Sequence, residues 1–206
     1  MYQGLLRLLR ILRSQSEGLN LSAWMLLLLK SLFKKENILV FGRELDWDVF
    51  TDDRNSLIFP KKGELQQLRN AREGLNPPQW EFCLDIYDHV ADFFVVENSD
   101  GIICHISWVY YKGDPNRNLS LDSDEAEIKY SFTVPEYRGK GLYPETLLEI
   151  QTYLNKNGCR KVFICVNEKN HASIKGVQKA GFGFIKKIRL MKFMGVQINR
   201  RFSEEN

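Results

Sequence analysis

The stretch that most constrains this chain is residues 134–148, V-P-E-Y-R-G-K-G-L-Y-P-E-T-L-L, in which a strand-like segment passes through an Arg-Gly-Lys-Gly turn into an amphipathic helix. Gly139 and Gly141 can adopt backbone angles that are barred to other residues, so successive N–H groups can converge on one point. The helix start adds its own unpaired N–H groups and the positive end of its dipole. Arg138 and Lys140 add mobile positive charge. The segment therefore predicts a strand–turn–helix unit whose turn binds a phosphate group.

The spacing of these glycines argues against two common nucleotide-binding motifs. It matches neither the G-x-G-x-x-G of Rossmann domains nor the G-x-x-x-x-G-K-[ST] of P-loops, so dinucleotides and Mg-nucleoside triphosphates are disfavoured as ligands. A second block, residues 162–182, contains a β-branched run V-F-I-C-V, then N-E-K-N-H-A-S, a short helical stretch and K-A-G-F. Each glycine alone is also typical of a plain turn or a helix cap. Two motifs that occur in this order and at this separation are a more specific signal than either motif alone.

Together the two blocks resemble the GNAT acyltransferase superfamily, over residues 90–190. The first signature of that superfamily is Gln or Arg, two residues, Gly, one residue, then Gly or Ala, and it falls on Arg138, Gly141 and Tyr143. Tyr143 departs from the small residue of the signature and could crowd a pyrophosphate. The second signature falls on Asn170, Ala172, Ser173, Gly181 and Phe182. The resemblance implies an acyltransferase with acetyl-CoA as its co-substrate.

The resemblance also implies which residues bind the co-substrate. Residues Phe132 to Val134, at the end of the strand, would donate N–H groups to the acyl carbonyl and pair with the pantetheine amides. The turn from Arg138 through Gly139, Lys140 and Gly141 to Tyr143 would take the pyrophosphate, and Asn170 would bond the pantetheine arm. The alternatives are a core strand for Phe132 and Val134, a solvated charged turn, and an N-cap role for Asn170.

Acyl transfer to an amine also needs a group that accepts the proton of the amine. Glu127 lies in Ala-Glu-Ile on the strand before the turn, and some histone acetyltransferases of the superfamily use a Glu in a similar strand as general base. His105 on the neighbouring strand is the rival base, because imidazole titrates near neutral pH. A structural role is the alternative for both: an exposed polar strand face for Glu127 and a hydrogen-bonded structural histidine for His105. The usual general acid of the superfamily is a Tyr four residues before Gly-Phe, where this chain has Val177, so Tyr143 or water would protonate the thiolate, or the thiolate would leave unprotonated.

The order of the predicted elements indicates the fold class. Strands are predicted over 37–45, 91–97, 101–111, 126–134, 161–166 and 183–193, and helices over 63–72, 79–89, 144–157 and 172–179. An antiparallel meander followed by alternating strands and helices predicts a mixed α/β fold. The resemblance implies a GNAT-like central mixed sheet with flanking helices, in which two strands splay apart to admit CoA. We therefore expect an N-terminal amphipathic helical segment at 1–35 and an acyltransferase domain at 36–206.

Composition bears mainly on the N-terminus and the compartment. Of the 206 residues 44% are hydrophobic and 27% charged, as in a soluble globular protein. The first 35 residues carry six basic residues and one acidic residue, so their charge exceeds the +3 of the whole chain. This leucine-rich segment would pack on the domain or a second subunit, or lie on an anionic membrane. Its longest apolar run, 23–29, falls short of the roughly 20 residues of a spanning helix. Four cysteines without a C-x-x-C pair favour a reduced, cytoplasmic protein, with peripheral membrane contact as a further expectation.

Two functional hypotheses follow. The first is an N-acetyltransferase in which the acceptor amine attacks acetyl-CoA directly, since no cysteine lies near the predicted thioester site. The acceptor would enter between the helices at 63–89, the loop at 113–125 and the C-terminal strands, beside Trp80, Trp108, Tyr110, Tyr111, Asp122, Asp124 and Glu125. With its peptide G-L-Y-P and a tryptophan on the third predicted strand, the chain resembles GNAT members associated with bacterial surface polysaccharide synthesis, which implies a nucleotide-linked amino sugar. The second hypothesis is a non-catalytic acyl-CoA-binding protein that docks to a membrane or a partner through its N-terminal helices. Neither a metal site nor nucleic-acid binding is expected, because the three histidines are scattered and no basic face carries interleaved aromatics.

Overall fold

The computed structural model describes residues 33–45, 60–73, 79–193 and 196–203. The chain divides into two compact units, one of residues 39–186 and one of residues 1–38 with 187–206. The predicted N-terminal helical segment falls almost wholly in residues 1–32, outside the described residues, so it stays a prediction.

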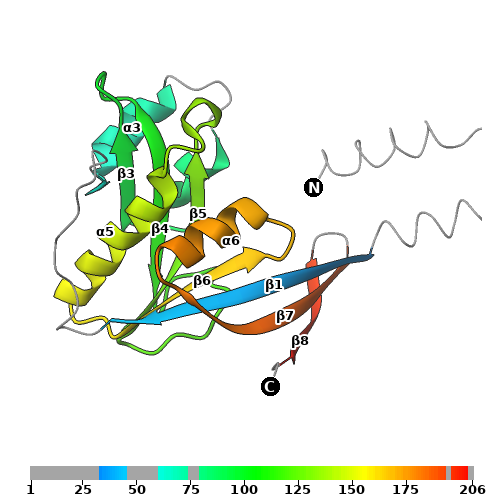
Figure 1. Cartoon of the computed structure of the whole chain (residues 1–206). Helices are drawn as coiled ribbons and strands as arrows, with labels where there is room; N and C mark the ends of the chain where they lie inside the picture. Colours follow the sequence, from blue (N-terminus) through cyan, green and yellow to red (C-terminus); the bar gives the residue numbers. More distant parts are fainter. Residues whose placement is uncertain (1–32, 46–59, 74–78, 194–195, 204–206) are drawn as a thin grey trace, which may run out of the picture. The chain divides into compact units, whose positions relative to one another are not determined.

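The unit of residues 39–186 is built on a mixed sheet (Figure 1). Its strands, in spatial order, are β2 (Lys61–Lys62), β3 (Phe93–Glu97), β4 (Ile103–Tyr111), β5 (Glu125–Thr133), β6 (Lys161–Asn167), residues 39–44 of β1 (Phe33–Glu44) and residues 183–186 of β7 (Gly183–Phe193). Strands β2 to β5 pair antiparallel, whereas β5 and β6 pair parallel. The predicted meander and the mixed α/β class are confirmed.

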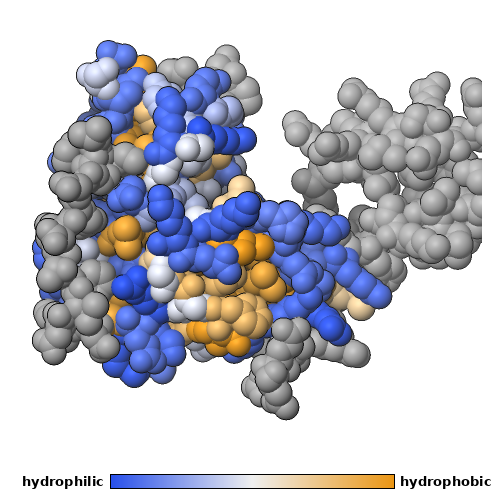
Figure 2. Space-filling model, viewed as in Figure 1, coloured by the Kyte–Doolittle hydropathy of each residue, from blue (hydrophilic) through white to orange (hydrophobic). Residues whose placement is uncertain are grey.

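Helices cover both faces of this sheet (Figure 1). They are α3 (Leu65–Glu73), η1 (Trp80–Phe82), α4 (Leu84–Tyr87), η2 (Pro135–Tyr137), α5 (Leu142–Lys156) and α6 (His171–Lys179). One core joins α5 and α6 to β5 and β6, and the other joins α3, η1 and α4 to β3 and β4. The outward side of α6 is hydrophilic, as its amphipathic pattern predicts (Figure 2). None of the described helices is long and apolar enough to cross a membrane.

Helix α5 forms where the sequence predicts it, because glycines mark both of its ends and apolar residues recur along one of its faces. Gly141 and Gly158 flank it with φ angles of 81° and 79°, a left-handed conformation that favours glycine at both positions. Leu147, Ile150 and Leu154 recur at helical spacing and are fully buried against the sheet. The helix therefore delivers its N-terminus to the end of β5, at the glycine turn.

One predicted helix is wrong. The pattern over 79–89 predicts one continuous helix, but the structure has two short elements, η1 and α4, separated by Cys83. Trp108 Nε1 donates to the carbonyl of Glu81 at 2.8 Å, and in a continuous helix that carbonyl would accept from Asp85. A contact from a distant strand thus takes the place of a local helical bond.

In the second unit, residues 187–193 of β7 pair antiparallel with β8 (Val196–Ser203), from Lys187 opposite Ser203 to Phe193 opposite Val196. Strand β7 is predicted with its observed bounds, whereas β8 lies beyond the predicted elements.

Candidate functional site

Strands β5 and β6 separate partway along their length. Their parallel pairing runs from Glu125 opposite Lys161 to Ile128 opposite Ile164 and ends there, although both strands continue. Beyond Ile128, the edge of β5 that faces β6 is therefore released from the sheet ladder. Such an edge offers backbone N–H and C=O groups to an extended ligand.

A bulge in β5 coincides with this separation. Between the pairs Ile106–Phe132 and Trp108–Lys129, β5 has one residue more than β4. Tyr130 lies in this extra step with a φ of 49°, which is unusual for a residue with a side chain. The bulge shifts the alternation of β5 by one residue. Backbone N–H and C=O groups before and after the bulge can therefore point to different partners.

The backbone after the bulge alternates between β4 and the open edge. The Val134 N–H donates to the carbonyl of Cys104 on β4 at 2.9 Å. The backbone N–H and C=O groups of Phe132, two residues earlier, also point to β4. Those of Thr133, between the two, point to the open edge. Of the residues expected to present N–H groups to a ligand, Val134 thus has its N–H bonded to β4, and ligand binding by Phe132 to Val134 stays a prediction. At the open edge, the carbonyl of Thr133 accepts from Arg138 Nε at 3.0 Å.

The turn after β5 is shaped to hold an anion. Gly139 and Gly141 have φ angles of 77° and 81°, and a Cβ on Gly139 would meet no atom within 4 Å. Gly141 is the N-cap of the 15-residue α5, and its carbonyl accepts the helical bond from Glu145 at 3.2 Å. The first N–H groups of α5 have no helical acceptor and, with the helix dipole, favour a phosphate. The residues present thus fit the pyrophosphate of CoA.

The cationic side chains of the turn fold back on neighbouring aromatic rings. The guanidinium of Arg138 lies 5.9 Å from the ring centre of Phe132, and Lys140 Nζ lies 4.7 Å from that of Tyr137. The Tyr137 hydroxyl accepts from Asn98 Nδ2 at 3.0 Å, which ties η2 to the β3–β4 hairpin. Arg138 and Lys140 are exposed and can turn toward a bound phosphate.

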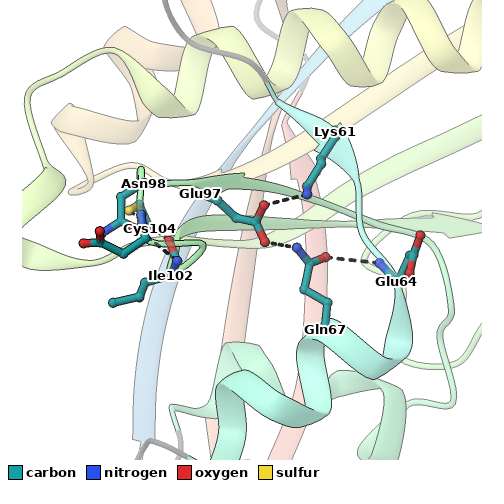
Figure 3. Close-up of polar contacts among 8 residues, drawn as sticks. Lys61, Glu64, Gln67, Glu97, Asn98, Ile102 and Cys104 are labelled. Atoms are coloured by element: carbon teal, nitrogen blue, oxygen red, sulfur yellow. Dashed lines mark hydrogen bonds and ion pairs between the residues drawn. The ribbon is translucent and has the colours of Figure 1, made fainter.

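A cavity of about 570 Å³ lies on the α3 face of the sheet, at the end of β5. Residues of α3 and η1 line one side, the β3–β4 hairpin a second, and Phe132, Val134, Pro135 and Tyr137 a third. Figure 3 shows the polar contacts beside it, where Gln67 Nε2 and Lys61 Nζ both meet the carboxylate of Glu97. In the hairpin, Asn98 Oδ1 accepts from the N–H group of Ile102 (Figure 3). The same oxygen accepts from the N–H group of Asp100. These contacts hold the wall of an otherwise apolar cavity that lies beside the open end of β5.

Glu127 does not face this cavity. Its side chain is fully buried, and its carboxylate accepts from Asn118 N at 2.9 Å, Asn118 Nδ2 at 2.8 Å and Leu119 N at 3.2 Å. Glu127 is thus not on the exposed strand face that alternation allowed, and these contacts are those of a residue that anchors the loop before β5. Its role as general base stays a prediction without support from its contacts.

His105 lies inside a buried polar network. Its Nδ1 lies 2.7 Å from Thr133 Oγ1 and its Nε2 lies 2.8 Å from Ser107 Oγ, which in turn donates to Ser131 Oγ at 2.8 Å. Burial lowers the pKa of His105 to about 3, so the imidazole is neutral at physiological pH. With both ring nitrogens engaged, His105 connects β4 to the open segment of β5, and its role as base also stays a prediction.

Tyr143 does not crowd the turn, because its side chain turns inward. The ring lies 5.8 Å from that of His105, and a Cβ on Gly176 of α6 would come within 2.6 Å of Tyr143 Cδ1. Burial raises the pKa of Tyr143 to about 12, against the opposing effect of hydrogen bonds with the side chains of Ser173 and Ser131. No sequence pattern predicts this placement, because it depends on the contact between two helices.

The second sequence block, residues 162–182, confirms one of the alternatives predicted for it. Asn170 Oδ1 accepts from Ser173 N at 3.1 Å, so the N-cap alternative is confirmed, and its binding of the pantetheine arm stays a prediction. Val177 is fully buried in the α5–α6 core. In the part of the chain that the structure describes, no group of three His, Cys, Asp or Glu could hold a metal ion.

The aromatic residues expected at the acceptor entrance separate into two groups. Trp108 and Tyr110 are fully buried and cannot contact a ligand directly. Trp80 is 47% exposed and stacks on Tyr87, with ring centres 4.7 Å apart. Tyr130 at the bulge meets the edge of Trp80 at 6.2 Å, so this exposed pair lies near the bulge.

Solved structures share this fold. A GNAT-family acetyltransferase from Colwellia psychrerythraea aligns with a TM-score of 0.56 and 14% identity, over 78% of this chain and 57% of its own. A GCN5-related N-acetyltransferase from Sphaerobacter thermophilus aligns with a TM-score of 0.55 and 15% identity, over 89% of this chain and 57% of its own. The glucosamine N-acetyltransferase region of a fungal multi-domain β-N-acetylglucosaminidase aligns at 0.58 and 13%, over 82% of this chain and 22% of that protein. This chain thus spans little more than half the length of the first two.

No curated protein matches the sequence. The family model described as an acetyltransferase (GNAT) domain matches residues 49–183, which include the bulged strand, the glycine turn and α6. The open edge of β5, the glycine turn at the start of α5 and this match agree, and the chain belongs to the GNAT acetyltransferase family.

Proposed function

We propose that this chain transfers an acetyl group from acetyl-CoA directly to the primary amine of a small molecule. The observation that carries the proposal is the separation of β5 from β6 beside a glycine turn that opens a long helix. An extended ligand with a diphosphate at one end fits an open strand edge that leads to an anion-binding helix start. Acetyl-CoA has this form and supplies an activated acyl group as a thioester.

The residues of the turn have the following roles in this proposal. The amides of Gly139 to Tyr143 bind the pyrophosphate, and Arg138 and Lys140 leave their aromatic contacts to pair with its charge. The open edge at Thr133 bonds the pantetheine arm and the acyl carbonyl, where an N–H donor stabilises negative charge on oxygen. Asn170 keeps its Oδ1 in the cap and can donate to the arm from Nδ2.

Direct transfer is supported by the state of Cys104, which pairs with Val134 just after β5 although the sequence predicts no cysteine near the thioester. Cys104 is paired with Val134 through its carbonyl, but its side chain packs with Val96 and Leu142. Burial raises the pKa of Cys104, so its thiol does not readily form the thiolate that attacks a thioester. An acyl-cysteine intermediate is therefore disfavoured, and the amine attacks the thioester itself.

For the acceptor, we propose an amino sugar that enters the cavity on the α3 face. The cavity lies against Phe132 and Val134, the strand segment next to the open edge. The exposed Trp80–Tyr87 pair supplies apolar faces on which a sugar ring can stack. The similar fungal structure is a glucosamine N-acetyltransferase region, which makes glucosamine and nucleotide-linked amino sugars the first acceptors to test.

The first experiment is calorimetric titration of the whole chain with acetyl-CoA and with CoA. We expect wild-type binding in the micromolar range, weakened at least about tenfold in the double variant Arg138→Ala, Gly141→Asp, which removes one charge and adds an opposing one. The matched control is Arg69→Ala, Gly158→Asp, because Gly158 has the same left-handed conformation at the far end of α5 and Arg69 is exposed. Equal binding by both double variants would contradict the assignment of the turn.

Turnover is tested by release of free thiol from acetyl-CoA with a panel of amino sugars. Acetylation of one of them establishes the reaction. Tight CoA binding without turnover of any amine would favour the second hypothesis, a non-catalytic acyl-CoA-binding protein. Failure of the folded wild type to bind CoA would overturn the proposal.

A further inference from the structure

The helix position that carries a tyrosine in the family pattern has no hydroxyl here. Val177 occupies it, and its side chain is fully buried among the apolar residues of α5 and α6. A thiolate that departs from acetyl-CoA is nevertheless stabilised by any hydrogen-bond donor aimed at the sulfur. A donor would have to come from another element that reaches the gap between β5 and β6.

Tyr143 of α5 reaches that gap. Its ring lies 5.8 Å from that of His105 on β4 and next to Gly176 of α6. The side chains of Ser131, one residue after the bulge on β5, and of Ser173 on α6 are the hydrogen-bonding neighbours of its hydroxyl. The hydroxyl thus lies between the open edge of β5 and the helix that follows β6. Ser131 also accepts from Ser107, which ties the hydroxyl to the His105 network.

The sequence of α6 is complementary to this placement. Gly176 stands directly before Val177, and a Cβ there would come within 2.6 Å of Tyr143 Cδ1 and 3.1 Å of Cε1. The lack of a side chain at Gly176 therefore makes the space in which the Tyr143 ring lies. A helix interior rarely favours glycine, so the contact gives a physical reason for its presence.

We propose that Tyr143 is the hydrogen-bond donor to the sulfur of the departing CoA, a role that rests on the proposed acetyl transfer. The amine nitrogen forms its bond to the acyl carbon, the carbon–sulfur bond breaks, and the electron pair goes to sulfur while the Tyr143 hydroxyl donates to it. The nitrogen loses its surplus proton to water, and the released thiolate takes one proton from water. Amine and thioester thus yield amide and thiol in balance.

The proton stays on Tyr143 during this step. Burial raises the pKa of Tyr143 to about 12, whereas an ordinary thiol has a pKa of about 8.5. Full transfer from the hydroxyl to a thiolate would therefore run uphill, and a hydrogen bond alone gives most of the stabilisation. His105 remains neutral because burial lowers its pKa, so the network orients Ser131 without adding charge.

The test variant is Tyr143→Phe, with Tyr153→Phe as the matched control. Tyr153 is on the same helix and its hydroxyl accepts from Lys62 at 2.7 Å, away from the gap. We expect Tyr143→Phe to lower kcat about tenfold to a hundredfold, the range for a lost hydrogen bond to a charged atom, with little change in the KM for acetyl-CoA. Tyr153→Phe should keep both values, and far-ultraviolet circular dichroism checks that both variants fold.

A second readout does not depend on turnover. Calorimetry at pH 9 compares CoA with desulfo-CoA, which lacks the sulfur. Wild type and Tyr153→Phe should bind CoA more tightly than desulfo-CoA, because the thiolate form is stabilised, and Tyr143→Phe should lose this preference. An unchanged preference together with an unchanged kcat would overturn the role of Tyr143.

Two further outcomes separate the inference from the proposed function. If Tyr143→Ala binds CoA more tightly than wild type, the ring fills space that the ligand needs, and the donor role is wrong even though acetyl transfer stands. If wild type binds neither CoA nor desulfo-CoA, the acetyl transfer itself is overturned, and the inference falls with it.

Discussion

At the scale of single residues, burial separates the groups that hold the site from those that can react in it. Glu127 is a carboxylate with no exposed surface, held by three N–H donors from residues 118 and 119. Lys129, two residues later, is nearly buried as well, and burial lowers its pKa although Glu127 and Asp88 oppose the shift. This pair of charges stabilises the loop before β5, because each charge is met by donors or acceptors of that loop.

Replacement of Glu127 distinguishes this structural role from catalysis. Glu127→Ala leaves three donors without an acceptor, so we expect the free energy of unfolding to fall by about 3 kcal/mol in urea titrations. Glu127→Gln keeps one oxygen and should cost about 1 kcal/mol, with kcat near that of wild type. Glu73→Ala, at an exposed position of α3, is the control and should stay within about 0.5 kcal/mol. A loss of kcat beyond about a hundredfold in a stable Glu127→Gln protein would restore Glu127 as the general base.

At the scale of elements, the contact between α5 and α6 predicts that Gly176→Ala destabilises the wild-type protein but stabilises a variant without the Tyr143 ring. Gly176→Ala improves helix propensity by about 1 kcal/mol, but its Cβ would press into the Tyr143 ring, and overpacking typically costs about 1–3 kcal/mol. We expect a net loss of stability in the wild-type background. In the Tyr143→Ala background the clash is absent, so the same substitution should stabilise by up to about 1 kcal/mol.

Urea titration of the four proteins in this cycle measures the coupling directly. Gln178→Ala is the control, because Gln178 is exposed on the same helix and should act equally in both backgrounds. If Gly176→Ala stabilises the protein in both backgrounds, the ring does not occupy the space beside Gly176.

The elements themselves differ in how far the sequence determines them. Helices α5 and α6 and strands β3 to β7 are predicted to within two residues, because glycine turns mark ends and apolar periodicity marks one face. The break at Cys83 is not predictable, since it depends on a hydrogen bond from Trp108 on another strand. Strand β2 has two residues, too few for any period. The same limit holds at the site: the glycine turn is local and predictable, whereas the inward turn of Tyr143 and the bonding of Val134 to β4 arise from neighbours distant in sequence.

At the scale of the whole molecule, one sheet serves two cores in the unit of residues 39–186. Neighbouring residues of the same strand point to opposite faces: Phe93 packs with α3 and η1, and Phe94 packs with the α5 side. Strand β5 contributes Ile128 to one core and Phe132 to the margin of the other. Loss of either core should therefore release the strand that carries the site.

This arrangement predicts one cooperative transition for that unit, coupled to ligand binding. Leu68→Ala on the α3 face and Leu154→Ala on the α5 face should each lower the free energy of unfolding by about 2–5 kcal/mol, with the same midpoint by circular dichroism and by tryptophan fluorescence. CoA at a hundred times its Kd should add about 2.7 kcal/mol to both variants, because it binds the folded state only. The Leu68→Ala variant is the more informative of the two, because Leu68 lies on the face of the sheet away from the glycine turn and α5. Two separate transitions, or CoA stabilisation confined to one of them, would show that the two faces fold independently and that the α3 face does not support the site.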